Sequence, residues 1–177
     1  MSKKILQLIA FLFLFQALSA QNTLDQKSIA EVIVKDATAM VSFLNAGDYK
    51  GYLKYIHPVR IEAGGGEARV ISQLDNQYGP LKAKGIVISG TVFDQPSEIV
   101  KSKNELQCTI SQQTEVKVAK GRVVTYTTFI GFSTDNGKTW KFVDTNNIDI
   151  AIIRKLFPNL SPKITIPPKK QPTVYNE

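Results

Sequence analysis

Hydrophobic positions in the first third of the chain recur at helical spacing. Between residues 27 and 47 they stand three or four apart and so share one face of a helix: Ile29, Val32, Ile33, Ala37, Met40, Val41 and Leu44. Thr23 and Gln26 have the spacing of a capping box, and Gly47 is suited to a helix end. The pattern predicts a long helix that packs one face against a core.

Two shorter helices are expected to follow. Asp48 is placed to cap the first of them, and His57-Pro58 to close it, because the residue before a proline is pushed out of helical geometry. We interpret Gly64-Gly65-Gly66 as a flexible hinge into the next helix, which is expected to end at Gly79-Pro80. The inward positions of these helices are Tyr49, Tyr52, Leu53, Ile56, Val70, Ile71 and Leu74.

The period changes to two after Pro80. Strands are predicted over residues 84–93, 98–101, 105–118, 123–133 and 139–143. In the third of these, the even positions from Leu106 to Val118 form one face and the odd positions form a polar face. Such strict alternation predicts an antiparallel sheet with one side wet or lightly covered.

The C-terminal part of the chain contains one more helix and a tail. Asn146 or Asn147 is placed to cap the helix, whose apolar positions are Ile148, Ile152 and Leu156. Five of the eight prolines lie in residues 158–177, which predicts an extended, mobile arm in which Ile164 and Ile166 add an edge strand.

The N-terminus predicts export. Residues 1–20 combine a basic start, an apolar run and small residues before Gln21, as in a cleaved secretory signal peptide. We expect a leader (1–20), a single domain (21–157) and a tail (158–177), with the product periplasmic or secreted and no membrane span after leader removal. No internal disulfide can form, because Cys108 is the only cysteine, and we expect its thiol to be buried and unreactive.

Charge argues against nucleic acid as a partner. The formal net charge is +7, and without the leader 20 basic residues stand against 15 acidic ones. The excess is scattered, whereas nucleic-acid binding favours clustered cations interleaved with aromatic residues. With one histidine and one cysteine far apart, no zinc-binding spacing exists either, and neither a metal nor an organic cofactor is expected.

Helices followed by a meander of long strands are typical of an α+β layer fold. The segments DATAMVSFLNAGDYKGYLKYIHP (36–58) and GGGEARVISQL (64–74), with the closing strands, resemble the nuclear transport factor 2-like superfamily, which includes SnoaL-like and ketosteroid isomerase-like domains. The resemblance covers residues 24–157 and implies a cone: helices packed in a strongly curved antiparallel sheet, with a pocket at the open end. GGGE before a helix is similar to small exported bacterial members of unassigned activity.

The resemblance implies a pocket but no reaction. Ketosteroid isomerase-like enzymes use a carboxylate base opposite a tyrosine and a protonated acid, and no residue set of this chain matches that arrangement position by position. The acid–base residues of SnoaL-like cyclases have no counterpart that can be assigned either.

The segment STDNGKTW (133–140) resembles the Asp box found on sialidase blades. A propeller needs at least four blades of about 40–50 residues each, and this chain has one box. We therefore interpret the segment as a hairpin turn. Ser133 and Asp135 are expected to bind its backbone, Gly137 to supply positive φ, and Trp140 to enter the core.

Several polar side chains are candidates for a site. His57 is either a general base or, more simply, a C-terminal helix cap. Asp144, at the end of a strand near the expected mouth of the cone, is the carboxylate to test first, and Tyr126 is the third catalytic candidate. The side chains expected to line a pocket, which otherwise serve as ordinary core, are Tyr49, Tyr52, Tyr55, Tyr126 and Trp140.

Three functions stay open at this level. The favoured one is an exported, non-catalytic domain that binds a small apolar ligand or forms a homodimer through its sheet face. The second is a small pocket enzyme, isomerase- or hydrolase-like, that uses Asp144, Tyr126 or His57. The third is a structural, envelope-associated protein. The lack of a clustered acid–base set favours the first over the second.

Overall fold

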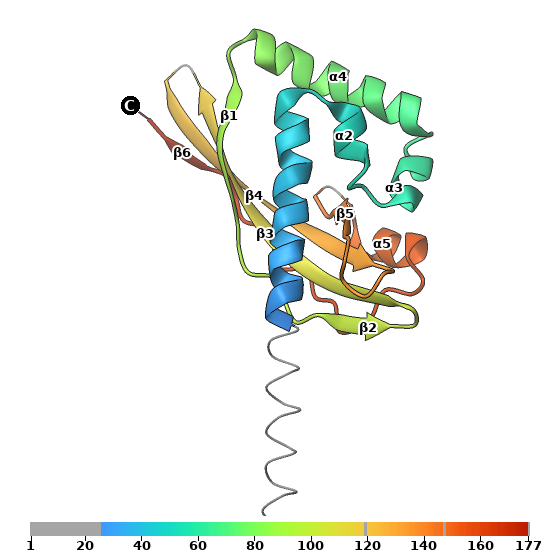
Figure 1. Cartoon of the computed structure of the whole chain (residues 1–177). Coiled ribbons are helices and arrows are strands. Elements are labelled where there is room, and N and C mark those ends of the chain that lie inside the picture. The colour runs from blue at the N-terminus through green and yellow to red at the C-terminus, as the bar shows by residue number, and fades with distance from the viewer. Residues whose placement is uncertain (1–25, 119, 147, 177) are drawn as a thin grey trace, which may run out of the picture.

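The computed structural model describes residues 26–118, 120–146 and 148–176, and these form an α+β fold (Figure 1). The proposed leader and Thr23 of the expected capping box lie outside the described residues. The first helix is described over residues 26–46, and its predicted face is confirmed, since Ile33, Ala37 and Met40 are fully buried.

The short helices after it begin at side-chain caps. The Asp48 carboxylate accepts a 2.9 Å hydrogen bond from the Gly51 N–H, which starts α2 (Tyr49–Leu53) as predicted. His57 does not close that helix. It is the N-cap of a further helix, α3 (Pro58–Ala63), because Pro58 fits the first helical position, where no N–H is needed.

The glycines after α3 form a defined turn, which corrects the interpretation of a flexible hinge. The Gly65 N–H donates to the Glu62 carbonyl at 2.9 Å, and the Gly66 N–H donates to the Ile61 carbonyl at 3.0 Å. Gly66 then caps the start of α4 (Glu67–Ala83).

The predicted end of α4 at Gly79-Pro80 is wrong. Pro80 lies inside the helix, which continues for one more turn. The true end is at Gly85, whose φ of 71° lets the chain leave in the left-handed conformation. The Gly85 N–H donates to Lys82 at 3.0 Å and the Ile86 N–H to Leu81 at 3.0 Å, which satisfies the last carbonyl groups.

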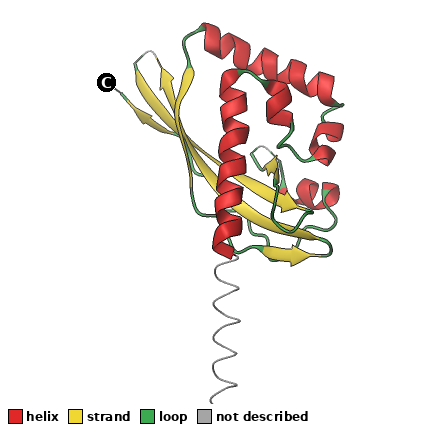
Figure 2. Ribbon diagram, viewed as in Figure 1, coloured by secondary structure: helices red, strands yellow, loops and turns green. Residues whose placement is uncertain are grey.

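A six-stranded antiparallel sheet follows the helices (Figure 2). Its strands are β1 (Val87–Phe93), β2 (Val100–Ser102), β3 (Glu105–Val118), β4 (Gly121–Ser133), β5 (Lys141–Asp144) and β6 (Thr173–Tyr175). The order is β1-β3-β4-β5, with β2 paired to β3 and β6 paired to β4. The α+β class and the strand meander are thus confirmed. A strongly curled, cone-like sheet is not confirmed and stays a prediction.

Two hydrophobic clusters cover the two faces of this sheet. The first helix and α2 pack against one face, where Cys108, Phe129 and Phe142 are buried. The opposite face carries Ile130 and Val143 and is covered by α5 (Ile150–Leu156) and the chain after it. The polar face of β3 is therefore not wet at this end, and Gln107 is 0% exposed.

The last helix and the tail differ from expectation. The side chain of Asp149, not Asn146, caps α5, and Asn147 lies outside the described residues. Ile153 is the buried residue of α5, whereas the predicted Ile152 is 52% exposed. The tail is attached to the sheet.

Three contacts fix that attachment. Ile164 is buried, so the segment after α5 is part of the second core. The Gln107 side chain donates to the Asn159 carbonyl at 3.0 Å and accepts from the Ser161 N–H at 2.8 Å. The added strand is β6, which pairs with residues 122–124, and not a strand at Ile164 and Ile166.

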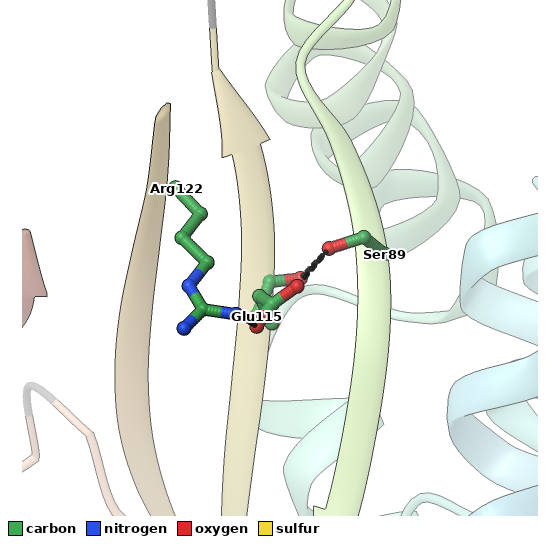
Figure 3. A network of polar contacts seen from close by, with 3 residues as sticks. All are labelled: Ser89, Glu115 and Arg122. Atoms are coloured by element: carbon green, nitrogen blue, oxygen red, sulfur yellow. Dashed lines mark hydrogen bonds and ion pairs between the residues drawn. The ribbon is translucent and has the colours of Figure 1, made fainter. Parts of the chain in front are cut away.

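A polar network ties three strands together on the outer face of the sheet (Figure 3). Glu115 on β3 accepts a 3.0 Å hydrogen bond from Ser89 on β1 and forms a 2.9 Å ion pair with Arg122 on β4. The Arg122 guanidinium also lies 4.8 Å from the centre of the Tyr175 ring. These side chains are partly exposed, so we expect the ion pair to stabilise the fold by about 0–1 kcal/mol.

Candidate functional site

A pocket of about 450 Å³ lies between the first helix, α2, α4 and the helix-facing side of the sheet. The size is within the usual range for small-molecule sites. Its apolar wall is formed by Met40, Val41, Leu44, Leu81, Ile86, Ile88, Val116 and Phe129. The apolar part of a ligand can therefore contact the first helix, α4 and the sheet.

Three polar side chains meet at this pocket from different elements. Asp144 ends β5, Tyr52 comes from α2 and Tyr78 from α4. Burial is the largest cause that raises the pKa of both tyrosines, and the nearby charge of Asp144 adds to the rise in each. A carboxylate and two phenols thus face the same space.

Burial controls the protonation of this group. It is the largest cause of the raised pKa of Asp144, which the Asn146 N–H and the positive charges of Arg60 and Lys169 partly oppose. Burial also raises the pKa of Tyr52 and Tyr78, so both phenols keep their protons at neutral pH and are donors.

One side of the Asp144 carboxylate is fixed by its own loop. Its Oδ1 atom accepts a 2.6 Å hydrogen bond from the Asn146 N–H, as in an Asx turn. The Asn146 side chain donates to the Thr127 hydroxyl on β4 at 2.7 Å, which holds the loop against the sheet. Among the described residues, no hydrogen bond is found for the hydroxyls of Tyr52 and Tyr78, so both can bind a ligand.

The sheet adds hydroxyl and amide groups to the pocket. Gln112 donates to the Thr114 hydroxyl at 2.5 Å, and both side chains are buried. Thr125 and Thr127 line the same wall. These groups are neutral, so Asp144 and the exposed Asp75 and Lys82 supply the charges at the pocket.

The structure places part of the predicted set in this pocket. Tyr49, Tyr52 and Asp144 line it. Tyr55 does not line it and stacks on Phe43, with ring centres 6.1 Å apart. Trp140 is fully buried in the core, as predicted for the turn, and does not line the pocket.

The three catalytic candidates do not meet in one site. Tyr126 faces the opposite side of the sheet, where it lines a second pocket. His57 packs edge-on against the stacked rings of Phe132 and Phe157, each 4.9 Å from it centre to centre. Of these three candidates, Asp144 alone lines the first pocket.

His57 acts as a structural acceptor. Its Nδ1 atom accepts a 3.3 Å hydrogen bond from the Val59 N–H, which requires that nitrogen to be unprotonated. Burial and the charge of Lys141 lower its pKa. The predicted C-terminal cap is therefore wrong, and the positive end of the α3 dipole also favours a neutral ring.

The STDNGKTW segment is a hydrogen-bonded turn, as predicted. Asp135 Oδ1 accepts from the Ser133 hydroxyl at 2.8 Å and from the Lys138 and Thr139 N–H groups at 3.1 and 3.0 Å. These bonds lower the pKa of Asp135 to about 2. Gly137 has a φ of 86°, and the indole of Trp140 donates to its carbonyl at 3.2 Å.

Cys108 is buried in the first cluster, as expected, and burial raises the pKa of its thiol to about 12. Within the described ranges, no group of three or more His, Cys, Asp and Glu side chains is arranged to hold a metal ion. No helix in the same part of the chain has the length and apolar character needed to cross a membrane.

Sequence reasoning missed Tyr78 and the sheet residues of the pocket. Tyr78 lies next to the predicted helix end at Gly79-Pro80, so the sequence did not indicate whether its side chain faces the core. Gln112 and Thr114 were placed on the correct face of β3, but their polarity did not mark them as pocket residues. Comparisons of the chain with models of protein families, with curated proteins and with solved structures found no match.

Proposed function

We propose that the first pocket binds a small, largely apolar ligand that presents one hydrogen-bonding group to Asp144, Tyr52 and Tyr78. The observation that carries the proposal is the convergence of these three side chains at one pocket of about 450 Å³ with mainly apolar walls. Such a combination orients a ligand by a few polar contacts while apolar burial supplies most of the affinity.

The chemistry at the polar end favours a group that both donates and accepts. Tyr52 and Tyr78 offer O–H donors, and the Asp144 carboxylate offers an acceptor. A hydroxyl or amine of the ligand can satisfy both kinds of partner. A second carboxylate would be repelled while Asp144 is ionised, so anionic ligands are disfavoured.

Native mass spectrometry of protein purified from its own host tests this role. Wild type is expected to retain a small molecule. Leu44→Trp, which places an indole at the pocket wall, is expected to lose it, whereas Val92→Trp on the exposed side of β1 is expected to keep it. No retained molecule in wild type, or equal retention in both variants, would contradict ligand binding in this pocket.

We also propose that the fold is the cone of the nuclear transport factor 2-like superfamily. Its support is the packing of the first helix across an antiparallel sheet, with the pocket at one end between that helix, α4 and the strands. An experimental structure in which β1, β3 and β4 form a flat sheet would overturn this assignment.

A pocket enzyme is the second candidate, favoured by the raised pKa of Asp144 beside two phenol donors. A carboxylate of this kind is suited to proton abstraction next to a group that the phenols polarise. Asp144→Asn is expected to abolish turnover of any substrate found in a broad panel, while Asp75→Asn, at the exposed rim, keeps it. Equal turnover by both variants would exclude Asp144 as the base.

Export and self-association belong to the same proposal. N-terminal sequencing of the protein recovered from the envelope or medium is expected to begin at Gln21. Light scattering is expected to give a dimer if the exposed part of the sheet face is an interface. A strict monomer at high concentration would contradict the dimer without affecting the ligand site.

A further inference from the structure

A second pocket, of about 380 Å³, lies on the opposite face of the sheet. Its floor is formed by side chains of the two long strands, among them Ser111 and Gln113 of β3 and Tyr126 and Thr128 of β4. Its other wall is the C-terminal segment 166–170, with Ile148 and Ile150 beside it. The proposed function in the first pocket does not use this space.

The C-terminal wall is held at both ends. Before it, Ile164 is buried in the second cluster, and the Arg154 guanidinium donates to the Ile164 carbonyl at 3.5 Å. After it, β6 pairs with residues 122–124 of β4. The proline pair 167–168 restricts the backbone between these two attachments. These attachments hold the C-terminal wall of the pocket in place.

The two walls differ in chemistry. The strand side offers hydroxyls and amides, which donate and accept hydrogen bonds, and Thr145 and Asn146 add two more such groups. The segment 166–170 offers Ile166 and the proline rings as apolar surface. A sugar ring has the same division, because its hydroxyls project from the edge and its C–H groups form apolar faces.

Charge and the aromatic ring narrow the ligand class further. The Lys170 ammonium lies 5.3 Å from the centre of the Tyr126 ring, so a cation and an aromatic face stand together in the pocket. Lys169 lines the same pocket, and Asp94 is the acidic residue in its wall. The charge of Lys169 also acts on Asp144, so Lys170 is the cation that we assign to a negatively charged group of a ligand.

We propose that the second pocket binds a saccharide that carries a carboxylate, of the uronic acid class. The ring lies near Tyr126, its hydroxyls contact Ser111, Gln113 and Thr128, and its carboxylate meets Lys170. The site lies on the other face of the sheet from the first pocket, which takes an apolar ligand and disfavours an anion.

Ligand-observed NMR and calorimetry with D-glucuronate and D-glucose test the proposal on the full chain. Wild type is expected to bind glucuronate more tightly than glucose, and added salt is expected to weaken the glucuronate complex. No binding of glucuronate, or equal affinity for the two sugars, would overturn it.

Two variants locate the site. Tyr126→Leu, which keeps an apolar side chain on β4, is expected to weaken glucuronate binding about tenfold. Lys170→Gln, on an exposed segment where the fold is not at risk, is expected to weaken glucuronate binding several-fold and leave glucose binding unchanged. Unchanged glucuronate affinity in Lys170→Gln would overturn the proposal even if the Tyr126 variant failed to fold.

The molecule offers a matched control. Tyr175 on β6 has the same kind of cation contact, with Arg122 at 4.8 Å, but does not line the pocket. Tyr175→Leu is therefore expected to bind glucuronate as wild type does. Leu44→Trp, which fills the first pocket, is expected to do the same, so failure of one ligand site is distinguishable from failure of the other.

Discussion

The main-chain N–H of Trp140 donates a 2.9 Å hydrogen bond to the carboxylate of Asp36, although the two residues are 104 positions apart. The bond joins the turn before β5 to the middle of the first helix. Trp140 is 0% exposed, and it stands between the turn and β5, so its N–H needs a partner from outside the turn. Asp36 supplies that partner. Burial raises the pKa of the Asp36 carboxyl, and the hydrogen bond from Trp140 partly opposes this rise.

Asp36→Ala is expected to lower the free energy of unfolding by about 1–2 kcal/mol, because the Trp140 N–H loses a charged acceptor. Chemical denaturation followed by Trp140 fluorescence measures the change. Lys35→Ala, at the exposed neighbouring position, is the control for helix propensity. Equal midpoints for the two variants would mean that the bond between helix and turn does not stabilise the fold.

Gly137→Ala is expected to destabilise the protein by more than Gly47→Ala does. Both glycines have positive φ, 86° and 77°, and an alanine there costs about 1–2 kcal/mol in backbone strain. A Cβ at Gly137 would also meet Ile29 carbon atoms at 3.0 and 3.1 Å, whereas a Cβ at Gly47 meets nothing within 4 Å. Thermal unfolding compares the two. A smaller loss of stability in Gly137→Ala than in Gly47→Ala would show that Ile29 and the first helix shift to accommodate the added Cβ atom.

His57 predicts a loss of stability as the pH falls below its ordinary pKa of 6.5. Since its folded pKa lies below the ordinary value of 6.5, the unfolded chain binds the proton more readily. Its contribution to stability is complete above pH 6.5 and decreases as the pH falls toward the folded pKa. Asp36 and Asp144 have raised pKa values and act in the opposite direction at lower pH.

A variant separates these effects. His57→Asn keeps an N-cap side chain and removes the only histidine, so its melting temperature is expected to fall less than that of wild type between pH 7 and pH 5.5. Parallel pH curves for the two proteins would exclude His57 as the source of the dependence.

Gln107→Ala is expected to lower the free energy of unfolding by about 2–4 kcal/mol, because the Ser161 N–H loses its acceptor and the buried side chain leaves a cavity. The Asn159 carbonyl also loses a donor but keeps the Ser102 hydroxyl at 2.7 Å. The chain after α5 should also become more sensitive to limited proteolysis. Gln113→Ala, at an exposed position of the same strand, is the control and is expected to change neither property. Cleavage at the wild-type rate in the Gln107 variant would contradict this role.

Elements that are stabilised by contacts between nearby residues could be predicted from the sequence. Asp48 caps α2 by binding Gly51, three positions away, and Asp135 organises a turn of a few residues, so both could be inferred from the adjacent sequence. The period-two pattern likewise predicted β3 with its exact bounds. By contrast, Pro80 was taken to end α4, because the stabilising turn at Gly85 was not recognised as the stronger stop signal.

The pocket depended on long-range packing that spacing does not reveal. Asp144 was a reasonable candidate from its position at a strand end, but its neighbour Tyr78 comes from a helix 66 positions earlier. Tyr126 was expected inside and lies on the other face, because the outer side of the sheet has a core of its own. Leu160 and Ile164 are part of that second core. They belong to residues 158–177, whose proline-rich composition had suggested an extended, mobile arm.

The attachment of Ser161 to Gln107 and the pairing of β6 with β4 have a consequence for biosynthesis. Residues 158–175 are synthesised after β3 and β4, so the outer face of the sheet stays uncovered until this segment leaves the ribosome. A polypeptide truncated after Phe157 would lack Leu160 and Ile164 and would expose Ile130 and Val143 to chaperones and proteases.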